Sequence, residues 1–234
     1  MKRFPFLPLF LTCLCLFSGC RMRRGSQSDV ADPDSLSVVE EPVAEFREPV
    51  FKASPIPPSI EARMRGISYP EGAEIPLSEL RYLELSYIDF DGVEHVGEMV
   101  CNKAIADDLV AIFRVLYQDR YPIRSMRLID DFGGDDIASM EADNTSCFNY
   151  RVVAGTKTLS KHARGLAVDI NPLENPYVRG EEVSPPGGVP YADRTQYFPH
   201  KIDREDLCCQ LFLERGFTWG GSWRTIKDYQ HFQK

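Results

Sequence analysis

Six prolines lie between residues 33 and 58, in a stretch without apolar periodicity, and they limit which part of the chain can fold. Residues 25–60 also carry seven acidic but only two basic side chains. Proline lacks the backbone N–H that a helix or sheet interior needs, and an acidic stretch with few apolar residues cannot build a core. We therefore expect an extended linker over residues 20–60 and one folded domain over residues 61–234.

The segment before this linker is typical of an export signal. Two basic residues precede an apolar run over residues 4–17, which is too short to cross a bilayer as a helix. The run ends in the tetrapeptide FSGC, which resembles the lipobox of bacterial lipoproteins. We expect residues 1–19 to be removed and Cys20 to carry a lipid that anchors an exported cell-envelope protein to a membrane. The alternative is a plain signal peptide with an unmodified Cys20.

The composition is that of a globular protein. Apolar residues make up 43% and charged residues 26% of the chain, and the formal net charge is −8. This balance excludes a mainly disordered chain and a polytopic membrane protein. The pI of about 5.1 argues against a nucleic-acid partner. No obligate protein partner is indicated.

Four cysteines follow Cys20 in the chain, at positions 101, 147, 208 and 209. None of them forms a C-x-x-C pair, so we do not expect a thiolate zinc site. An oxidising compartment permits one disulfide, but we prefer the interpretation as buried free thiols.

The apolar pattern predicts a hairpin followed by a helix. Residues 82–90 alternate apolar and polar side chains, Asp91-Gly92 is a turn signal, and residues 93–100 form the return strand. Asn102 is suited to cap the following helix, and Pro122 limits its far end. The apolar stripe of this helix consists of Ile105, Leu109, Ile112, Phe113 and Leu116.

Further short elements complete the expected domain. We expect strands over residues 123–129 and 166–170, and a second helix over residues 203–215 that Asp203 caps. The inner stripe of this helix consists of Leu207 and Leu211. Strands and helices mix without a βαβ rhythm. We therefore expect the α+β class, with a small, mostly antiparallel sheet and packed helices.

Two stretches carry residues of metal-ligand type. His162 precedes the predicted strand 166–170, and Asp169 lies on the polar face of that strand. A carboxylate between apolar neighbours is costly to bury unless a cation pairs with it, and imidazole and carboxylate are ordinary zinc ligands. His231 is the best candidate for a third ligand, and Asp228 is suited to accept a proton from a metal-activated water. The spacing alone leaves open a capped loop with a surface histidine.

These stretches belong to longer motifs. SKHARGLAVD over residues 160–169, and the later WGGSW and DYQHF, resemble motifs of the M15 family of zinc peptidases, most closely those of its M15C branch of cell-wall peptidases. DNTSCFNYR over residues 143–151, and DINP with the following NPY, also resemble that branch. The resemblance covers roughly residues 83–232. It implies the α+β zinc-peptidase fold shared with the Hedgehog signalling domain.

The resemblance also implies roles for individual residues. It implies that His162, Asp169 and His231 bind one zinc ion (Zn2+). It implies Asp228 as general base and Arg151 as the group that binds the substrate carbonyl or the developing oxyanion. A structural ion pair is the alternative role for Arg151.

Other residues are expected around this site. We predict that Trp223 and Tyr177 line the substrate cleft and that Trp219 points inward. Ser160 is expected to contact substrate or support the ligand shell, and the alternative is that it ends a turn. The remaining histidines, at positions 95 and 200, are expected near the surface.

The resemblance favours a metallopeptidase that hydrolyses peptidoglycan stem peptides. Two bonds remain open: cleavage as an L-Ala-D-Glu endopeptidase or as a D-Ala-D-Ala carboxypeptidase. The alternative from a different class is a non-catalytic, zinc-containing lipoprotein that binds the cell wall. The presence of Asp228 and Arg151 together with the three implied ligands favours the enzyme, because a pure scaffold needs neither.

Overall fold

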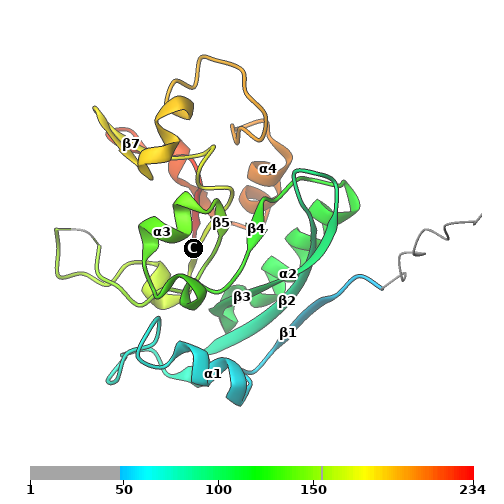
Figure 1. Cartoon of the computed structure of the whole chain (residues 1–234), viewed down its shortest axis with the longest axis vertical. Coiled ribbons are helices and arrows are strands. Elements are labelled where there is room, and N and C mark those ends of the chain that lie inside the picture. Colours follow the sequence, from blue (N-terminus) through cyan, green and yellow to red (C-terminus); the bar gives the residue numbers. More distant parts are fainter. Residues whose placement is uncertain (1–47, 154) are drawn as a thin grey trace, which may run out of the picture. The chain divides into compact units, whose positions relative to one another are not determined.

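The computed structural model describes residues 48–153 and 155–234, which form helices and short strands (Figure 1). The predicted signal over residues 1–19, Cys20 and the linker up to residue 47 lie outside the described residues. Within the described part of the chain, no helix combines the length and the apolar character that a membrane crossing requires.

The folded domain begins earlier than the sequence predicts. β1 (Phe51–Ser54) pairs antiparallel with the next strand, so that Phe51 lies opposite Leu85. α1 (Pro58–Met64) also starts inside the predicted linker. Pro58 occupies a first-turn position, where a missing N–H costs nothing. The prolines of this region therefore flank a strand and start a helix, and the expectation of a linker is wrong for residues 51–60.

The predicted hairpin and helix are confirmed. β2 (Leu80–Ile88) and β3 (Glu94–Asn102) pair antiparallel, and the sheet order is β1-β2-β3. The side chain of Asn102 accepts a hydrogen bond from Ala104 N at 3.0 Å and caps α2 (Lys103–Gln118). All five residues of the predicted stripe are buried. α2 contacts β1 and β2, which it covers on one side (Figure 1).

The segment after α2 is less regular than predicted. β4 (Ser125–Met126) has two residues and pairs parallel with β5 (Asn144–Thr145), so the strand predicted over residues 123–129 is too long. Arg127 N donates to the Asn144 side chain at 2.8 Å instead of continuing the ladder. The short helical elements of the domain are η1 (Leu77–Glu79), η2 (Ile129–Phe132), α3 (Asp136–Glu141), η3 (His162–Arg164), η4 (Pro186–Tyr191) and η5 (Gly220–Ser222).

The second predicted helix begins later than expected. α4 (Leu207–Glu214) is capped by Asp206, which accepts from Cys208 N at 2.9 Å, whereas Asp203 accepts from Glu205 N in the preceding turn. The buried face shifts accordingly, because Leu207 and Leu211 are only half-buried. The buried residues are Cys208, Cys209 and Phe212. All four cysteines of the described residues are buried free thiols, as expected.

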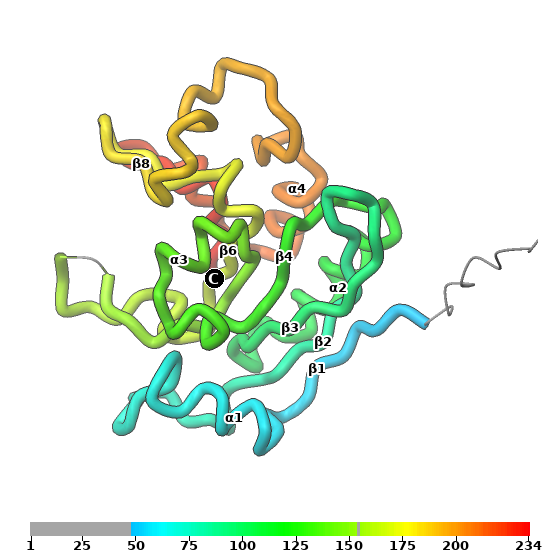
Figure 2. Tube along the Cα trace, in the orientation of Figure 1, coloured from blue at the N-terminus to red at the C-terminus, as the bar shows by residue number. Residues whose placement is uncertain are grey.

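The C-terminal half contains two further small antiparallel sheets, of order β6-β11-β9 and β10-β7-β8. Their strands are β6 (Ala167–Asp169), β7 (Tyr177–Arg179), β8 (Glu182–Ser184), β9 (Thr218–Trp219), β10 (Lys227–Asp228) and β11 (His231–Gln233). Val168 and Phe232 join one apolar core with α2 and α4. The β7–β8 hairpin lies at the end of the domain opposite α1 (Figure 2). The α+β class with small antiparallel sheets is confirmed.

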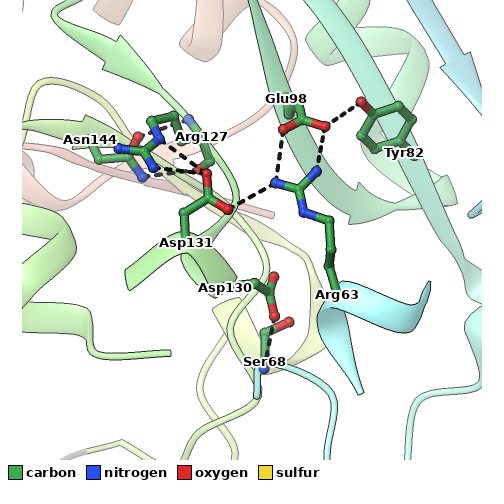
Figure 3. A network of polar contacts seen from close by, with 8 residues as sticks. All are labelled: Arg63, Ser68, Tyr82, Glu98, Arg127, Asp130, Asp131 and Asn144. Carbon is green, nitrogen blue, oxygen red and sulfur yellow. Dashed lines mark hydrogen bonds and ion pairs between the residues drawn. The ribbon is translucent and has the colours of Figure 1, made fainter. Parts of the chain in front are cut away.

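A network of hydrogen bonds and ion pairs connects α1 to the first sheet and to η2 (Figure 3). The Arg63 guanidinium donates to both Glu98 oxygens, at 2.8 and 3.0 Å, and to Asp131 at 2.9 Å. The Tyr82 hydroxyl donates to Glu98 at 2.6 Å. One arginine thus neutralises two carboxylates from different elements. Its loss would leave Glu98 without a cationic partner, while Asp131 would keep its ion pair with Arg127.

We expect Arg63→Met to lower the free energy of unfolding by about 1–2 kcal/mol, less than for a fully buried pair because the network is partly solvated. Arg65→Met, at the C-cap of the same helix, is the matched control, because Arg65 pairs with Glu61 at the surface. We expect the control to change the free energy by less than about 0.5 kcal/mol. Urea denaturation of the three proteins measures both values, and equal effects would contradict the role of the network.

Two buried carboxyl groups form a pair, one just before β5 and the other in the connection from β6 to β7. Asp143 and Glu174 are 4% and 8% exposed, and their carboxyl groups lie close enough to share one proton. Burial and the Asp143 charge raise the pKa of Glu174 to about 8. Burial also raises the pKa of Asp143, while Arg124 opposes both shifts. Glu174 is therefore the protonated donor at neutral pH.

The folded state holds a proton on Glu174 that the unfolded chain releases near pH 4.5. Stability should fall as pH rises from there to about 8, because the folded state binds more protons over this range. The slope approaches about 1.4 kcal/mol per pH unit. We expect Glu174→Gln, which stays neutral and can still donate to Asp143, to flatten this dependence. Unfolding measured from pH 5 to pH 8 checks the result, and an unchanged slope would contradict it.

Candidate metal centre

Asp169 and His231 are brought together by the pairing of β6 with β11, in which they are direct partners. The backbone N–H and C=O of Asp169 bond to Ser146, at 2.9 and 3.1 Å, and thus point away from β11. Asp169 and His231 therefore form a non-hydrogen-bonded pair, the arrangement in which opposite side chains approach most closely. The strand register alone places the carboxylate beside the imidazole.

His162 reaches the same place from η3, the turn that precedes β6. Ser160 Oγ accepts from Ala163 N at 3.0 Å and stabilises the start of this turn. Gly165 ends it in the left-handed conformation, with φ of 66°. A Cβ at position 165 would lie 2.6 Å from Asn102 N, so only glycine fits. The turn directs His162 back toward β6.

Three potential ligand atoms converge as a result. His162 Nε2 lies 3.2 Å from Asp169 Oδ2, and His231 Nδ1 lies 3.0 Å from Asp169 Oδ1. The two histidine nitrogens lie 3.2 Å apart. All three residues are buried, and their ligand atoms lie within 4.8 Å of one another. Such a cluster of nitrogen and oxygen donors is suited to hold a cation.

The outer hydrogen bonds of the histidines fix which nitrogens face inward. His162 Nδ1 lies 2.7 Å from the Cys147 carbonyl oxygen, which can only accept, so Nδ1 carries the hydrogen. His231 Nε2 likewise donates to Gln233 Oε1 at 3.0 Å. The lone pairs of His162 Nε2 and His231 Nδ1 then face inward, where a cation beside the Asp169 carboxylate can accept them. This donor set fits a divalent metal ion.

The electrostatics of the cluster also favour a positive charge. Burial alone raises the pKa of Asp169, but the charges and hydrogen bonds of His162 and His231 outweigh it and hold the pKa well below its usual range. Burial lowers the pKa of His231, yet the hydrogen bond and charge of Asp169 raise it to about 9. Without a metal the cluster therefore holds a proton at neutral pH, and a metal must displace it.

Asp228 lies next to this cluster on β10, opposite Tyr177 of β7. Burial raises the pKa of Asp228 to about 6, and Asp169 adds to the rise while His231 and His162 oppose it. Its Oδ1 is buried and has no hydrogen-bond partner among the described residues. Gly220 makes room for Asp228, since a Cβ there would lie 2.5 Å from the Asp228 carbonyl oxygen. A half-buried carboxylate with one uncommitted oxygen is suited to exchange protons.

Arg151 is held outside the three-residue cluster. Its guanidinium pairs with Asp136 of α3 at 2.7 Å. Its Nε is buried and lacks a partner within residues 48–153 and 155–234. The ion pair was the alternative role for this residue, while its contact with substrate stays a prediction.

The residues predicted to line the substrate cleft differ in their burial and in the residues that they contact. The Trp223 ring is half-buried, with its centroid 5.4 Å from that of His231. Trp219 is buried as predicted, and its Nε1 donates to the Tyr229 carbonyl at 2.8 Å. Ser160 is buried in the turn that contains His162. Tyr177 lies opposite Asp228 as its strand partner. Substrate contact by Ser160, Trp223 and Tyr177 stays a prediction.

The other two histidines lie elsewhere. His95 is exposed on the hairpin and lies 2.6 Å from Asp89. The His200 ring stacks on Phe90, with centroids 3.6 Å apart. Neither belongs to the His/Asp cluster.

Three groups that support the predicted site residues were not predicted from the sequence. Gln233 follows His231 by two and faces the same side of β11, but the sequence predicted no strand there, so this relation was not recognised. Gln230 is buried between two predicted site residues, Asp228 and His231, and it opposes the rise in the pKa of Asp228. The Cys147 carbonyl had no signal, because every residue has one.

Comparison with known proteins agrees with this site. A family model of the M15 peptidases, described as D-alanyl-D-alanine carboxypeptidase, matches residues 154–234. The matched region contains His162, Asp169, Asp228 and His231, whereas Arg151 precedes it. No curated protein and no solved structure matched the chain. The match supports the M15 resemblance over the C-terminal part of the chain.

Proposed function

We propose that the protein is a zinc metallopeptidase that hydrolyses a peptide bond in the stem peptides of peptidoglycan. The convergence of His162, Asp169 and His231 beside Asp228 carries the proposal. The M15 match supports peptidase chemistry, and its description concerns a D-alanyl-D-alanine bond.

The three ligand atoms suit a catalytic zinc site in number and type. Two imidazoles and one carboxylate leave one position of a tetrahedron for water or substrate, whereas structural zinc sites are usually closed by four protein ligands. A bound zinc ion supplies Lewis acidity, which polarises the scissile carbonyl and acidifies a water molecule. His162 and His231 must be neutral to bind it, so we expect affinity to fall in acid.

The protein's own groups supply the proton transfers. Asp228 takes a proton from the attacking water at its uncommitted Oδ1 and returns it to the leaving amine. Burial raises the pKa of this carboxyl to about 6, which brings it nearer to neutral pH. Such a general base contributes typically 10²–10⁴-fold to the rate.

Arg151 is the proposed partner of the carbonyl oxygen as negative charge develops on it. Asp136 holds the guanidinium through one terminal nitrogen, and the buried Nε remains without a partner among the described residues. A positioned donor of this kind is worth about 3–4 kcal/mol of barrier. Trp223 and Tyr177 are proposed to form walls of the substrate cleft.

The proposed location of the enzyme follows from its N-terminal sequence. A lipid on Cys20 would hold the protein at a membrane of the bacterial cell envelope, and the acidic, proline-rich segment would give the peptidase reach toward the wall. Peptidoglycan stem peptides are then the substrate within reach.

Digestion of purified muropeptides and of defined stem peptides tests the function. We expect products that disappear when a chelator removes the metal, identified by mass spectrometry. Release of D-alanine would identify a carboxypeptidase, and cleavage between L-Ala and D-Glu an endopeptidase. A zinc-loaded protein that forms no product from any of these substrates would overturn the proposal in favour of a non-catalytic wall-binding protein.

Loss of a ligand tests the metal site. We expect His162→Ala and Asp169→Ala to retain less than roughly a tenth of the zinc of the wild type, because two remaining ligands bind weakly. His95→Ala, at an exposed histidine of the hairpin, should keep full zinc content. Elemental analysis after dialysis measures the zinc-to-protein ratio. Full zinc content in the His162 variant would show that another residue is the ligand.

Replacement of the base separates metal binding from chemistry. We expect Asp228→Asn to keep zinc and to lower kcat by roughly 10²–10⁴-fold, because an amide cannot accept the proton. Asp91→Asn, at an exposed turn residue, is the control and should leave kcat unchanged. Undiminished turnover in Asp228→Asn would remove the assignment of the base.

A further inference from the structure

A second recessed site lies away from the His/Asp cluster. A cavity of about 330 Å³ opens between Tyr121, at the end of α2, the segment over residues 197–203, and Asp206 at the start of α4. This volume is at the lower end of the range for ligand pockets, about 300–1,000 Å³. None of its lining residues belongs to the proposed metal site.

Hydrogen bonds from side chains hold the backbone that forms the walls of this cavity. Lys201 Nζ donates to the Arg194 carbonyl at 2.6 Å and closes the segment on itself. The His200 carbonyl accepts from Asn175 Nδ2 at 3.0 Å, and Asn171 Nδ2 binds the Pro122 carbonyl at 3.0 Å. The backbone of these walls is therefore held before a ligand binds, which lowers the entropic cost of binding there, while the exposed Tyr197 side chain is not held by these bonds.

Side chains that contain a ring dominate the surface of the cavity. Six of its nine lining residues are aromatic or proline, the latter being Pro122 and Pro199. Tyr197 is 93% exposed, although tyrosine ordinarily buries much of its ring. The open Tyr197 ring can stack on the C–H face of a pyranose or on another flat apolar group, whereas the His200 ring already stacks on Phe90.

The remaining lining residues select a polar, uncharged ligand. Asp206 Oδ1 accepts from the Tyr121 hydroxyl at 3.0 Å and from Cys208 N at 2.9 Å, and all hydrogen bonds to Asp206 from the described residues use this oxygen. Its second oxygen is available to accept. Asp203 adds a second carboxylate, and Lys201 supplies the one positive charge. Two carboxylates disfavour an anion, whereas hydroxyl and amide N–H groups are suitable donors to them.

We propose that this cavity binds a sugar ring of the glycan strand from which the stem peptide is suspended, that is, an N-acetylated amino sugar. This inference rests on the proposed function, since it concerns the second component of the same polymer. A sugar combines an apolar ring face for Tyr197 with donors for Asp203 and Asp206. The enzyme would thus hold the glycan at one site while it cleaves the peptide at another.

Titration of the full-length protein with the N-acetylglucosamine trimer, followed by NMR, tests the site. We expect saturable binding with a Kd near or below about 1 mM. Tyr197→Ala should weaken it at least about tenfold, and folding should tolerate this change because the side chain is exposed. Val189→Ala is the control, because it is a 60% exposed position outside the cavity and should bind like the wild type.

Absence of saturable binding at about 10 mM sugar would overturn the proposal, as would binding that Tyr197→Ala leaves unchanged. A cavity that instead binds a proline-rich peptide and ignores the sugar would also overturn it.

Further measurements separate this inference from the peptidase proposal. Asp228→Asn should bind the trimer as the wild type does, because the sugar site does not need turnover. In the active protein, Tyr197→Ala should lower the ratio of kcat/KM for glycan-linked over free stem peptide about tenfold. Sugar binding without any hydrolysis would refute only the peptidase, and hydrolysis with an unchanged ratio would refute only the sugar site.

Discussion

The antiparallel pairing of β6 with β11 is the constraint on which the candidate site depends. It joins segments that are 62 residues apart and makes Asp169 the direct partner of His231. Side chains alternate along a strand, so a slip of one residue would turn one of the two away from the other. The apolar partners Val168 and Phe232, both fully buried, oppose such a slip. The packing of the core therefore sets the geometry of the donors.

The polar groups behind the site extend this constraint into the rest of the domain. Asn171 and Asn175 are fully buried and bond to segments on both sides of the β6–β7 connection. Arg194 reaches the same region, donating to the Glu174 carbonyl at 2.8 Å, and its guanidinium lies 4.3 Å from the Tyr229 ring centroid. Side chains therefore hold the irregular backbone of the β6–β7 connection, where no sheet ladder does so.

The sequence predicted the elements whose signals are local. The hairpin over β2 and β3 has alternating side chains and a turn dipeptide, and α2 has a stripe and a cap, so both were found. β9, β10 and β11 have two or three residues each, which is too short for any periodicity. The prolines around β1 and α1 led to the prediction of a linker there. An edge strand and a first helical turn tolerate proline as well as a linker does.

The candidate site was predicted from residue types, and its geometry was not. His162, Asp169 and His231 converge in the structure, as the zinc hypothesis requires. Their supports depend on register and turn conformation, which a single sequence does not reveal. Arg151 shows this limit, because its ion pair with Asp136 joins a loop to a helix that the sequence analysis did not predict.

The two histidines of the cluster differ in what orients them. The main chain of Cys147 holds His162, so replacing that side chain leaves the acceptor in place. The side-chain amide of Gln233 orients His231, so a single substitution at position 233 can change how much electron density this imidazole offers. Exchange of Gln233 for a carboxylate would make the imidazole more basic, and exchange for an apolar residue would release it. Natural variation and engineering can therefore tune this centre through its last strand, while the opposite side stays fixed by the fold.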